Sequence, residues 1–204
     1  MFTMIDGWHV PADDKRAFGA IMIEAGMIPH VARKCVHRRT CLQAGGNIGI
    51  FPSILSRFFQ TVHTFELDPD NFTALKMNVG EIENIITRNA ALTDFHGTVG
   101  VDRIKPNNIG AHQVSSSGMI PTVTIDDLGL EDLDLLWLDI EGSEHSAILG
   151  ATKTIHQCLP VVVLELKGLG QRYGHSDQQT FDLMDALGYK VSEKIGRDYI
   201  FVRA

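Results

Sequence analysis

The chain has 204 residues, of which 44% are hydrophobic and 21% charged, a balance typical of a globular domain with a sizeable core. Its formal net charge of −7 disfavours a broad nucleic-acid-binding face, which is normally basic. No apolar run approaches the roughly 20 residues that span a bilayer. We therefore expect neither a nucleic acid nor a membrane as a partner.

The first residues and the cysteines bear on location in the cell. The first residues lack the basic-then-apolar pattern of a secretory signal. Cys35, Cys41 and Cys158 are spaced too widely for a disulfide framework or a zinc site. We expect reduced thiols in a cytoplasmic protein. The sequence leaves the oligomeric state open, a homodimer included.

Residues 1–38 are expected to form an N-terminal helical extension that packs on a core domain of residues 39–204. A short leader, 1–12, precedes helices expected at 13–25 and 29–36.

Two features of this extension allow more than one interpretation. Trp8 and His9 either line a substrate mouth or pack the leader against the domain. The basic residues between Arg33 and Arg39 form either a solvated face or a contact for an anionic substrate.

Residues 39–68 have the pattern strand, glycine turn, helix and strand. The strand at 40–43 is short and apolar enough to be buried on both faces, as a central parallel strand would be. Glycines within 45–49 allow a tight turn and a close approach of a ligand. The strand at 62–65 leads to Glu66, whose carboxylate can accept hydrogen bonds from both hydroxyls of a ribose. Such a unit is typical of proteins that bind a nucleotide-like cofactor.

The glycine turn also indicates the size of that cofactor. Gly45-Gly46-Asn47-Ile48-Gly49 is shorter than the dinucleotide fingerprint and carries no Lys-Ser or Lys-Thr pair for phosphates. A nucleoside that bears an amino-acid carboxylate suits it better, and S-adenosylmethionine fits that description. The alternative is that the glycines merely turn the chain.

The next stretch is expected to form the adenine side of a pocket. Asp68 should cap the following helix, and residues 84–88 should form a third strand. The small side chains of Ala90 and Ala91 would let an adenine ring lie against the chain. Asp94 is expected either to reach the adenine amine or to cap a turn.

A short hairpin is expected at 95–101, followed by the least regular stretch of the chain, 102–121. Loops of this length are usually functional or disordered, so we interpret the stretch as a candidate substrate lid. His112 lies within it, although a lone histidine in a loop is more often a bystander than a base.

In the second half, strands are expected at 133–139 and 161–165, with one helix between them that begins near Ser143. Glu66, Asp139 and Glu165 then stand at the carboxyl ends of three strands. In an open parallel sheet these ends share one edge, where ligands bind.

The last part of the chain begins with a glycine-rich loop at 167–175, which we expect to move when substrate binds. A capping box at 176–179 opens a helix, and the strands 189–194 and 198–202 form a hairpin. Together the elements predict an α/β, Rossmann-like doubly wound fold. Its mostly parallel seven-stranded sheet would end in an antiparallel hairpin and carry helices on both faces.

Three blocks of the chain resemble the FkbM family of S-adenosylmethionine-dependent methyltransferases. They are Gln43–Gly49 with Phe65–Pro69, then Asn89–Leu92, and finally Val123–Leu128 with Leu138–Glu144 and Leu149–Ala151. The Asp-Ile-Glu-Gly-Ser-Glu sequence at 139–144 is the most specific part, and the likeness spans residues 40–204. The family usually has aspartate where this chain has Gln43, and lysine where it has Trp137.

The resemblance implies S-adenosylmethionine as methyl donor and S-adenosylhomocysteine as product. It also implies O-methylation of a hydroxyl on a sugar or another small molecule, so the acceptor would be a small molecule or a glycan. We expect the cofactor to contact Gln43, Gly45, Gly46, Asn47, Glu66, Leu67, Ala90, Ala91 and Asp139.

A hydroxyl acceptor must also lose its proton to a base. Asp139 is the first candidate, as the base or as a ligand of the cofactor's amine. Glu141 and His145 come next as catalytic residues because they follow the same strand, and Glu165 and His175 are outside candidates. Two carboxylates without a third marked ligand are weak support for Mg²⁺, so we expect no metal.

Two other functions remain open. The departures at Gln43 and Trp137 keep open a catalytically inactive S-adenosylmethionine-binding module. A nicotinamide-dependent oxidoreductase would use the same strand-turn-helix unit, but the short glycine turn and the 139–144 sequence disfavour it.

Overall fold

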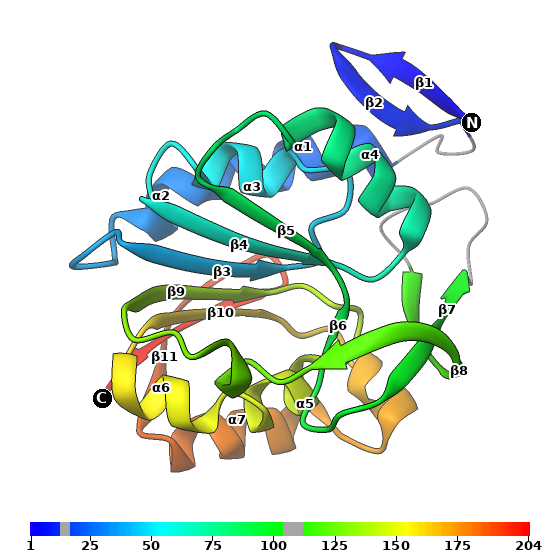
Figure 1. Ribbon diagram of the computed structural model, residues 1–204. Helices are drawn as coiled ribbons and strands as arrows, with labels where there is room; N and C mark the ends of the chain where they lie inside the picture. Colours follow the sequence, from blue (N-terminus) through cyan, green and yellow to red (C-terminus); the bar gives the residue numbers. More distant parts are fainter. Residues whose placement is uncertain (13–16, 104–111) are drawn as a thin grey trace.

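The structure is a computed structural model that describes residues 1–12, 17–103 and 112–204 (Figure 1). A twisted sheet lies at its centre with helices above and below, and a smaller sheet lies beside it. Within the described residues, no helix combines the length and the apolar character needed to cross a bilayer.

The central sheet has seven strands in the order β11-β12-β10-β9-β3-β4-β5. Neighbouring strands are parallel except at β12, which is antiparallel to both β10 and β11. The predicted fold class is therefore confirmed. The strands are β3 (Thr40–Ala44), β4 (Thr61–Glu66), β5 (Ile85–Asn89), β9 (Leu133–Leu138), β10 (Val161–Glu165), β11 (Tyr189–Ile195) and β12 (Asp198–Arg203).

Two hydrophobic cores cover the two faces of the sheet, because successive residues of a strand point to opposite sides. In β9, Leu135 and Trp137 join the core under α1–α4, whereas Leu136 and Leu138 join the core under α5–α7 (Figure 1). The helices are α1 (Ala17–Glu24), α2 (Ile28–Ala32), α3 (Ile50–Leu55), α4 (Pro69–Val79), α5 (Glu144–Leu149), α6 (Thr152–Cys158) and α7 (Asp177–Ala186), with short 3₁₀ segments at Ala25–Met27, Asp126–Leu128 and Leu169–Tyr173.

Two helix starts are confirmed in detail. The Asp68 side chain accepts hydrogen bonds from the N–H groups of Asp70 and Asn71, at 2.8 and 3.3 Å, and so caps α4. At α7, Ser176 and Gln179 form the predicted capping box.

The prediction of a single helix from near Ser143 is wrong, because this stretch forms two helices, α5 and α6, separated at Gly150. A Cβ atom at Gly150 would lie 2.1 Å from the carbonyl oxygen of Thr93, so only glycine fits this approach. The second helix then receives a remote cap, since Asp126 accepts from the N–H of Thr154 at 2.8 Å.

The smaller sheet has the order β6-β8-β7, with β6 at Ala91–Leu92, β7 at Thr98–Arg103 and β8 at His112–Val123. The expected short hairpin at 95–101 and the irregular stretch that follows are wrong for the described residues, which form a long antiparallel pair. Gly100 and Gly118 allow this pairing, because a Cβ atom at Gly118 would lie 2.3 Å from the Cα atom of Gly100. The part of the candidate lid at 104–111 lies outside the described residues.

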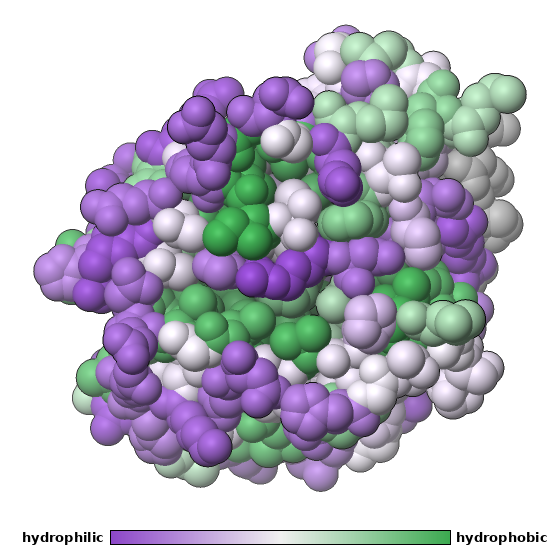
Figure 2. Space-filling view, viewed as in Figure 1, coloured by the Kyte–Doolittle hydropathy of each residue, from purple (hydrophilic) through white to green (hydrophobic). Residues whose placement is uncertain are grey.

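The first residues form a hairpin, β1 (Phe2–Ile5) and β2 (Trp8–Pro11), which the sequence did not predict. Its turn has positive φ angles at Asp6 and Gly7, 48° and 85°, as a two-residue hairpin turn requires. Trp8 packs against the core under α1–α4. The hairpin projects at the upper right of Figure 2, where hydrophobic and polar side chains are mixed. Of the helix expected at 13–25, residues 13–16 lie outside the described residues.

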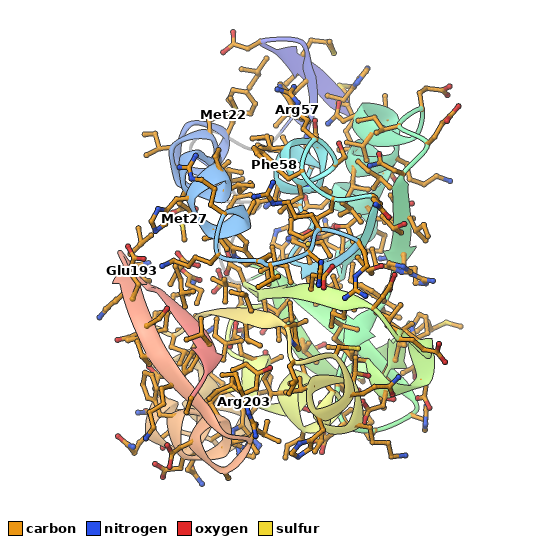
Figure 3. The ribbon with its side chains drawn as sticks, turned by 90° about the vertical axis from the view of Figure 1, so that its left-hand side faces the viewer. Met22, Met27, Arg57, Phe58, Glu193 and Arg203 are labelled. Carbon is orange, nitrogen blue, oxygen red and sulfur yellow. The ribbon has the colours of Figure 1, made fainter. Side chains whose placement is uncertain are left out.

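The C-terminal hairpin is tied to the N-terminal helices by charge. Glu193, at the left edge of Figure 3, pairs with His30 and Lys34 of the α2 region, each at 2.8 Å. In the same view Met22 lies on the outer side of α1, where 44% of it is exposed.

Candidate active site

A cavity of about 690 Å³ opens at the carboxyl ends of β3, β4, β9 and β10. Its wall also includes α1 and the start of β8. The structure brings together at this cavity all the residues that we expect to contact the cofactor: Gln43, Gly45, Gly46, Asn47, Glu66, Leu67, Ala90, Ala91 and Asp139. Their binding of a cofactor stays a prediction.

The glycine turn is fixed by its packing against two neighbouring strands. The N–H groups of Gly45 and Gly46 both donate to the carbonyl of Phe65, at 3.1 and 2.8 Å. Gly45 has φ +85°, and a Cβ atom there would lie 2.0 Å from the carbonyl oxygen of Asp139. The turn therefore joins the ends of β4 and β9, which gives this glycine a packing role besides any contact with a ligand.

Glu66 presents a buried carboxylate at the floor of the cavity, with 5% of the residue exposed. Its two oxygens accept from the N–H groups of Asn47 and Asp68, at 2.6 and 2.8 Å. Burial raises the pKa of Glu66 to about 7, although these two N–H groups favour the charged form. Asn47 donates from a left-handed conformation, φ 48°, which asparagine adopts more readily than most residues.

Asn89 shapes the wall next to Glu66. Its amide nitrogen donates to the carbonyls of Glu66 and Leu67, at 2.8 and 2.9 Å. Leu67, Ala90 and Ala91 thereby line one side of the cavity with small or apolar groups. Sequence reasoning assigned Asn89 no role, and the available signal was its position directly after the third strand.

Asp68 ties the β7–β8 pair to this wall. Its side chain is completely buried and pairs with Arg103 Nε at 2.7 Å and His112 Nδ1 at 3.0 Å. Burial alone would raise the pKa of Asp68, but the hydrogen bonds from His112 and Arg103 bring it well below its usual value. His112 lines the cavity, so the structure makes it part of the wall. Sequence reasoning found the cap at Asp68 but missed Arg103.

Asp139, Glu141 and Glu165, here called the carboxylate cluster, surround the ammonium of Lys167 on the opposite side of the cavity. Lys167 Nζ lies 3.0 Å from Glu141 Oε1 and 3.9 Å from Asp139 Oδ1, and it donates to Glu165 Oε2. Desolvation at the cavity wall and a hydrogen bond shared with Glu165 raise the pKa of Asp139. Burial acts in the same direction on Glu165, but the bonds from Asp139 and Lys167 prevail and lower its pKa. The pair can therefore hold one proton between its two carboxyls.

Glu144 explains why the 139–144 sequence ends in glutamate. Only 3% of it is exposed, and its Oε1 accepts from the N–H groups of Ile140 and Gly142, at 2.9 and 3.3 Å. Burial raises the pKa of Glu144 to about 7. The turn also needs Gly142, because with φ +108° a Cβ atom there would meet the backbone of Leu169 at 2.7 Å. Glu144 thus shapes the loop that carries Glu141.

The family model of the methyltransferase FkbM domain matches residues 43–191. The chain belongs to this family. The match contains the glycine turn, Glu66 and the 139–144 sequence, and it confirms the resemblance seen in the sequence. A comparison with curated proteins gave no match.

Several solved structures are similar to this chain in fold. Methyltransferase FkbM from Methylobacillus flagellatus KT is 17% identical with a TM-score of 0.54, and the alignment covers 81% of this chain but 43% of that one. The chain therefore spans less than half of that protein. M. jannaschii TYW2 in complex with AdoMet is 14% identical with a TM-score of 0.51, covering 100% and 86% of the two chains. N-methyltransferase NodS from Bradyrhizobium japonicum WM9 in complex with S-adenosyl-l-homocysteine is 12% identical with a TM-score of 0.52, covering 89% and 84%.

The two departures from the family pattern both lie at the cavity. Gln43 is 1% exposed, and its Oε1 accepts from the hydroxyl of Thr64 at 2.7 Å. Trp137 packs edge-to-face on Phe51, with ring centroids 5.3 Å apart, and its indole N–H donates to Asp198. Each side chain therefore has at least one hydrogen-bond partner within the protein.

His145, expected among the catalytic residues, does not line the large cavity. Its ring stacks on that of His175 with centroids 4.1 Å apart, and its Nδ1 lies 3.2 Å from the hydroxyl of Thr180. His175 and Asp94 instead line a smaller cavity of about 280 Å³. There Asp94 accepts from the hydroxyl of Ser146. Of the three expected catalytic residues, Asp139 and Glu141 are brought together and His145 is not.

Proposed function

We propose that this FkbM-family protein transfers the methyl group of S-adenosylmethionine to a hydroxyl of a sugar or another small molecule. The observation that carries the proposal is that one cavity holds Glu66 on one side and the carboxylate cluster on the other. Its volume of about 690 Å³ falls within the range of roughly 300–1,000 Å³ typical of small-molecule sites.

The residues on the Glu66 side fit the nucleoside part of this cofactor. The Glu66 carboxylate would accept hydrogen bonds from the ribose hydroxyls, and Leu67, Ala90 and Ala91 would flank the adenine. The turn at Gly45 and Gly46 would lie against the amino-acid part. NodS and TYW2, which carry the same fold, are described with S-adenosylhomocysteine and AdoMet bound, and this supports the proposal.

The carboxylate cluster would serve the acceptor. The bound donor supplies a methyl group already activated by a positive sulfur, so the protein has to orient the acceptor, exclude water and remove a proton. Asp139 is 40% exposed at its side chain and faces the cavity, whereas the Glu165 side chain behind it is 10% exposed. The acceptor's proton would pass to this pair as its oxygen attacks the methyl group.

Calorimetric titration of the purified protein with S-adenosylhomocysteine, and separately with NADH, tests the cofactor. We expect micromolar binding of the first and none of the second. Binding of NADH alone would replace the proposal by an oxidoreductase. Binding of neither ligand would contradict the proposed methyl transfer.

The acceptor is tested next by incubating the protein and S-adenosylmethionine with a panel of sugars, glycans and hydroxylated small molecules. The formation of S-adenosylhomocysteine is measured by mass spectrometry. We expect turnover with a neutral hydroxyl compound. Tight cofactor binding without turnover on any acceptor would instead indicate an inactive binding module. A cytoplasmic location belongs to the same proposal.

A further inference from the structure

Lys167 occupies the centre of the carboxylate cluster. Its side chain is 17% exposed, and its Nζ faces a carboxylate oxygen from each of Asp139, Glu141 and Glu165. Two of these carboxylates are also largely enclosed, with side-chain exposures of 15% for Glu141 and 10% for Glu165. An ammonium held by several carboxylates inside a cavity is costly to build, because each charge loses water on burial. So costly an arrangement of charges indicates that Lys167 has a role in the function of the site.

The geometry of the carboxylates is that of a cation-binding site. One ligand oxygen from each of the three lies within 4.8 Å of the others. A divalent cation 2.0–2.6 Å from each oxygen would require oxygens no more than about 5 Å apart. The three oxygens are thus close enough for a divalent cation of this range, with a shift of a few tenths of an ångström for the shorter bonds of Mg²⁺ or Mn²⁺. The ammonium of Lys167 stands where such an ion would be held.

The fold after β10 places the lysine there. Glu165 is the last residue of β10, and Lys167 follows two residues later in a bend that brings its Nζ onto the Glu165 carboxylate. The segment is held on both flanks, by the Leu166 N–H on the carbonyl of Arg197 at 3.1 Å and by the Gly168 N–H on Asp177 Oδ2 at 2.8 Å. Lys167 is therefore held in position by its backbone as well as by its ion pairs.

We propose that Lys167 is a positioning residue that takes the place of a divalent metal ion at the acceptor side of the cavity. This inference rests on the proposed methyl transfer for its catalytic meaning. Lys167 holds the three carboxylates around one point and offsets their charge. The acceptor's O–H proton passes to the Asp139–Glu165 pair, the C–O bond forms, and the methyl–sulfur bond breaks with its electron pair left on sulfur. Lys167 keeps its protons throughout.

Titration with Mn²⁺ tests the positioning role without needing an acceptor. Calorimetry is performed on the wild type and on the Lys167→Met, Lys167→Gln and Lys167→Arg variants. Lys190→Met is the matched control, since Lys190 pairs with Asp185 on the surface with both side chains 68% exposed. Lys167→Met and Lys167→Gln should bind one Mn²⁺ about tenfold more tightly than the wild type or more, because carboxylates suit this ion. Lys167→Arg and Lys190→Met should behave as the wild type.

Stoichiometric binding of Mn²⁺ by the wild type would overturn the proposal, because the cluster would then be a metal site from which the lysine is displaced. So would two folded neutral variants that gain no Mn²⁺ affinity. The wild-type titration alone keeps the proposal falsifiable if neither neutral variant folds.

A titration with S-adenosylhomocysteine on the same proteins separates this inference from the proposed function. If the wild type does not bind S-adenosylhomocysteine, the proposed function is contradicted, but the Mn²⁺ result still tests the positioning role of Lys167. Once an acceptor is found, Lys167→Met should lower kcat by about a hundredfold or more, the lower end of a placed base's contribution, with a smaller change in S-adenosylhomocysteine affinity. Lys167→Arg should recover part of kcat, and EDTA should leave the wild-type kcat unchanged. The positioning role of Lys167 would be refuted if EDTA inhibited the wild type. It would also be refuted if kcat fell equally in the neutral variants and in Lys167→Arg.

Discussion

The backbone N–H of Asn47 donates to Oε2 of Glu66 at 2.6 Å, which joins the turn after β3 to the end of β4 at the carboxylate that faces the cavity. The other oxygen of Glu66 accepts from the Asp68 N–H at 2.8 Å. Two backbone donors thus fix the side chain in the orientation that a ribose diol would meet. This pair of contacts makes Glu66 the most direct point at which to test cofactor binding.

Glu66→Gln should weaken S-adenosylhomocysteine binding by about 1–3 kcal/mol, because an amide nitrogen would face a backbone N–H and one ribose hydroxyl would lose its acceptor. Calorimetric titration measures the change. Glu83→Gln is the control, since Glu83 lies exposed before β5. Unaltered affinity in Glu66→Gln would show that the ribose is bound elsewhere.

The burial of Glu144 predicts a specific pH dependence of the free energy of unfolding. Its pKa in the folded protein is about 7 because of burial, against a usual value of 4.5. The folded state therefore binds more protons, and the free energy of unfolding falls as the pH rises from about 4.5 to 7. Glu144→Gln cannot titrate, so its unfolding free energy should fall less between pH 5 and pH 8, by up to about 3 kcal/mol relative to the wild type. Urea unfolding at the two pH values measures this difference, and an identical pH dependence in both proteins would contradict it.

Substitution of the buried Asp68 should be costly to stability. Asp68→Ala removes the cap of α4 and leaves Arg103 and His112 without their buried partner, so we expect a loss of about 2 kcal/mol or more in the free energy of unfolding. Ser176→Ala, which removes only a helix cap, should cost about 1 kcal/mol. Chemical denaturation measures both. Equal losses would mean that the ion pairs add nothing to the cap.

Alanine variants of Gly45 and Gly129 distinguish the cost of backbone strain from the cost of steric crowding. Both have positive φ, +85° and +61°, but a Cβ atom would meet the Asp139 carbonyl at Gly45 and nothing within 4 Å at Gly129. Gly129→Ala should cost about 1–2 kcal/mol from strain alone. Gly45→Ala should cost about 3 kcal/mol or more and should abolish S-adenosylhomocysteine binding, because the turn must move away from β9. A Gly45→Ala protein that is as stable as Gly129→Ala would contradict the packing role of this glycine.

The parts of the fold that sequence predicted well rest on local signals. Asp68 before Pro69 and Ser176 before Gln179 cap their own helices, so a few neighbouring residues contain the information. The apolar strand Val161–Glu165 likewise needs no knowledge of its partners. Glu66, Asp139 and Glu165 could be placed at one edge because parallel topology brings carboxyl ends together.

The errors arose where a distant partner decides the structure. Strand β8 contains a run of three serines, and it forms because Gly100 of β7 can approach it closely. The helix break at Gly150 depends on Thr93, far away in the sequence. Lys167 was read as part of a mobile glycine-rich loop, because no local pattern shows that three carboxylates from elsewhere surround it.

Asn78 of α4 connects the first residues of the chain with the glycine turn. Its amide nitrogen donates both to the carbonyl of His9 in the N-terminal hairpin and to the carbonyl of Ile48 beside the glycine turn, at 2.9 and 2.8 Å, while its oxygen accepts from the His9 N–H at 2.8 Å. A recombinant protein trimmed of residues 1–12 would leave this amide half-bonded and loosen the segment that carries Asn47.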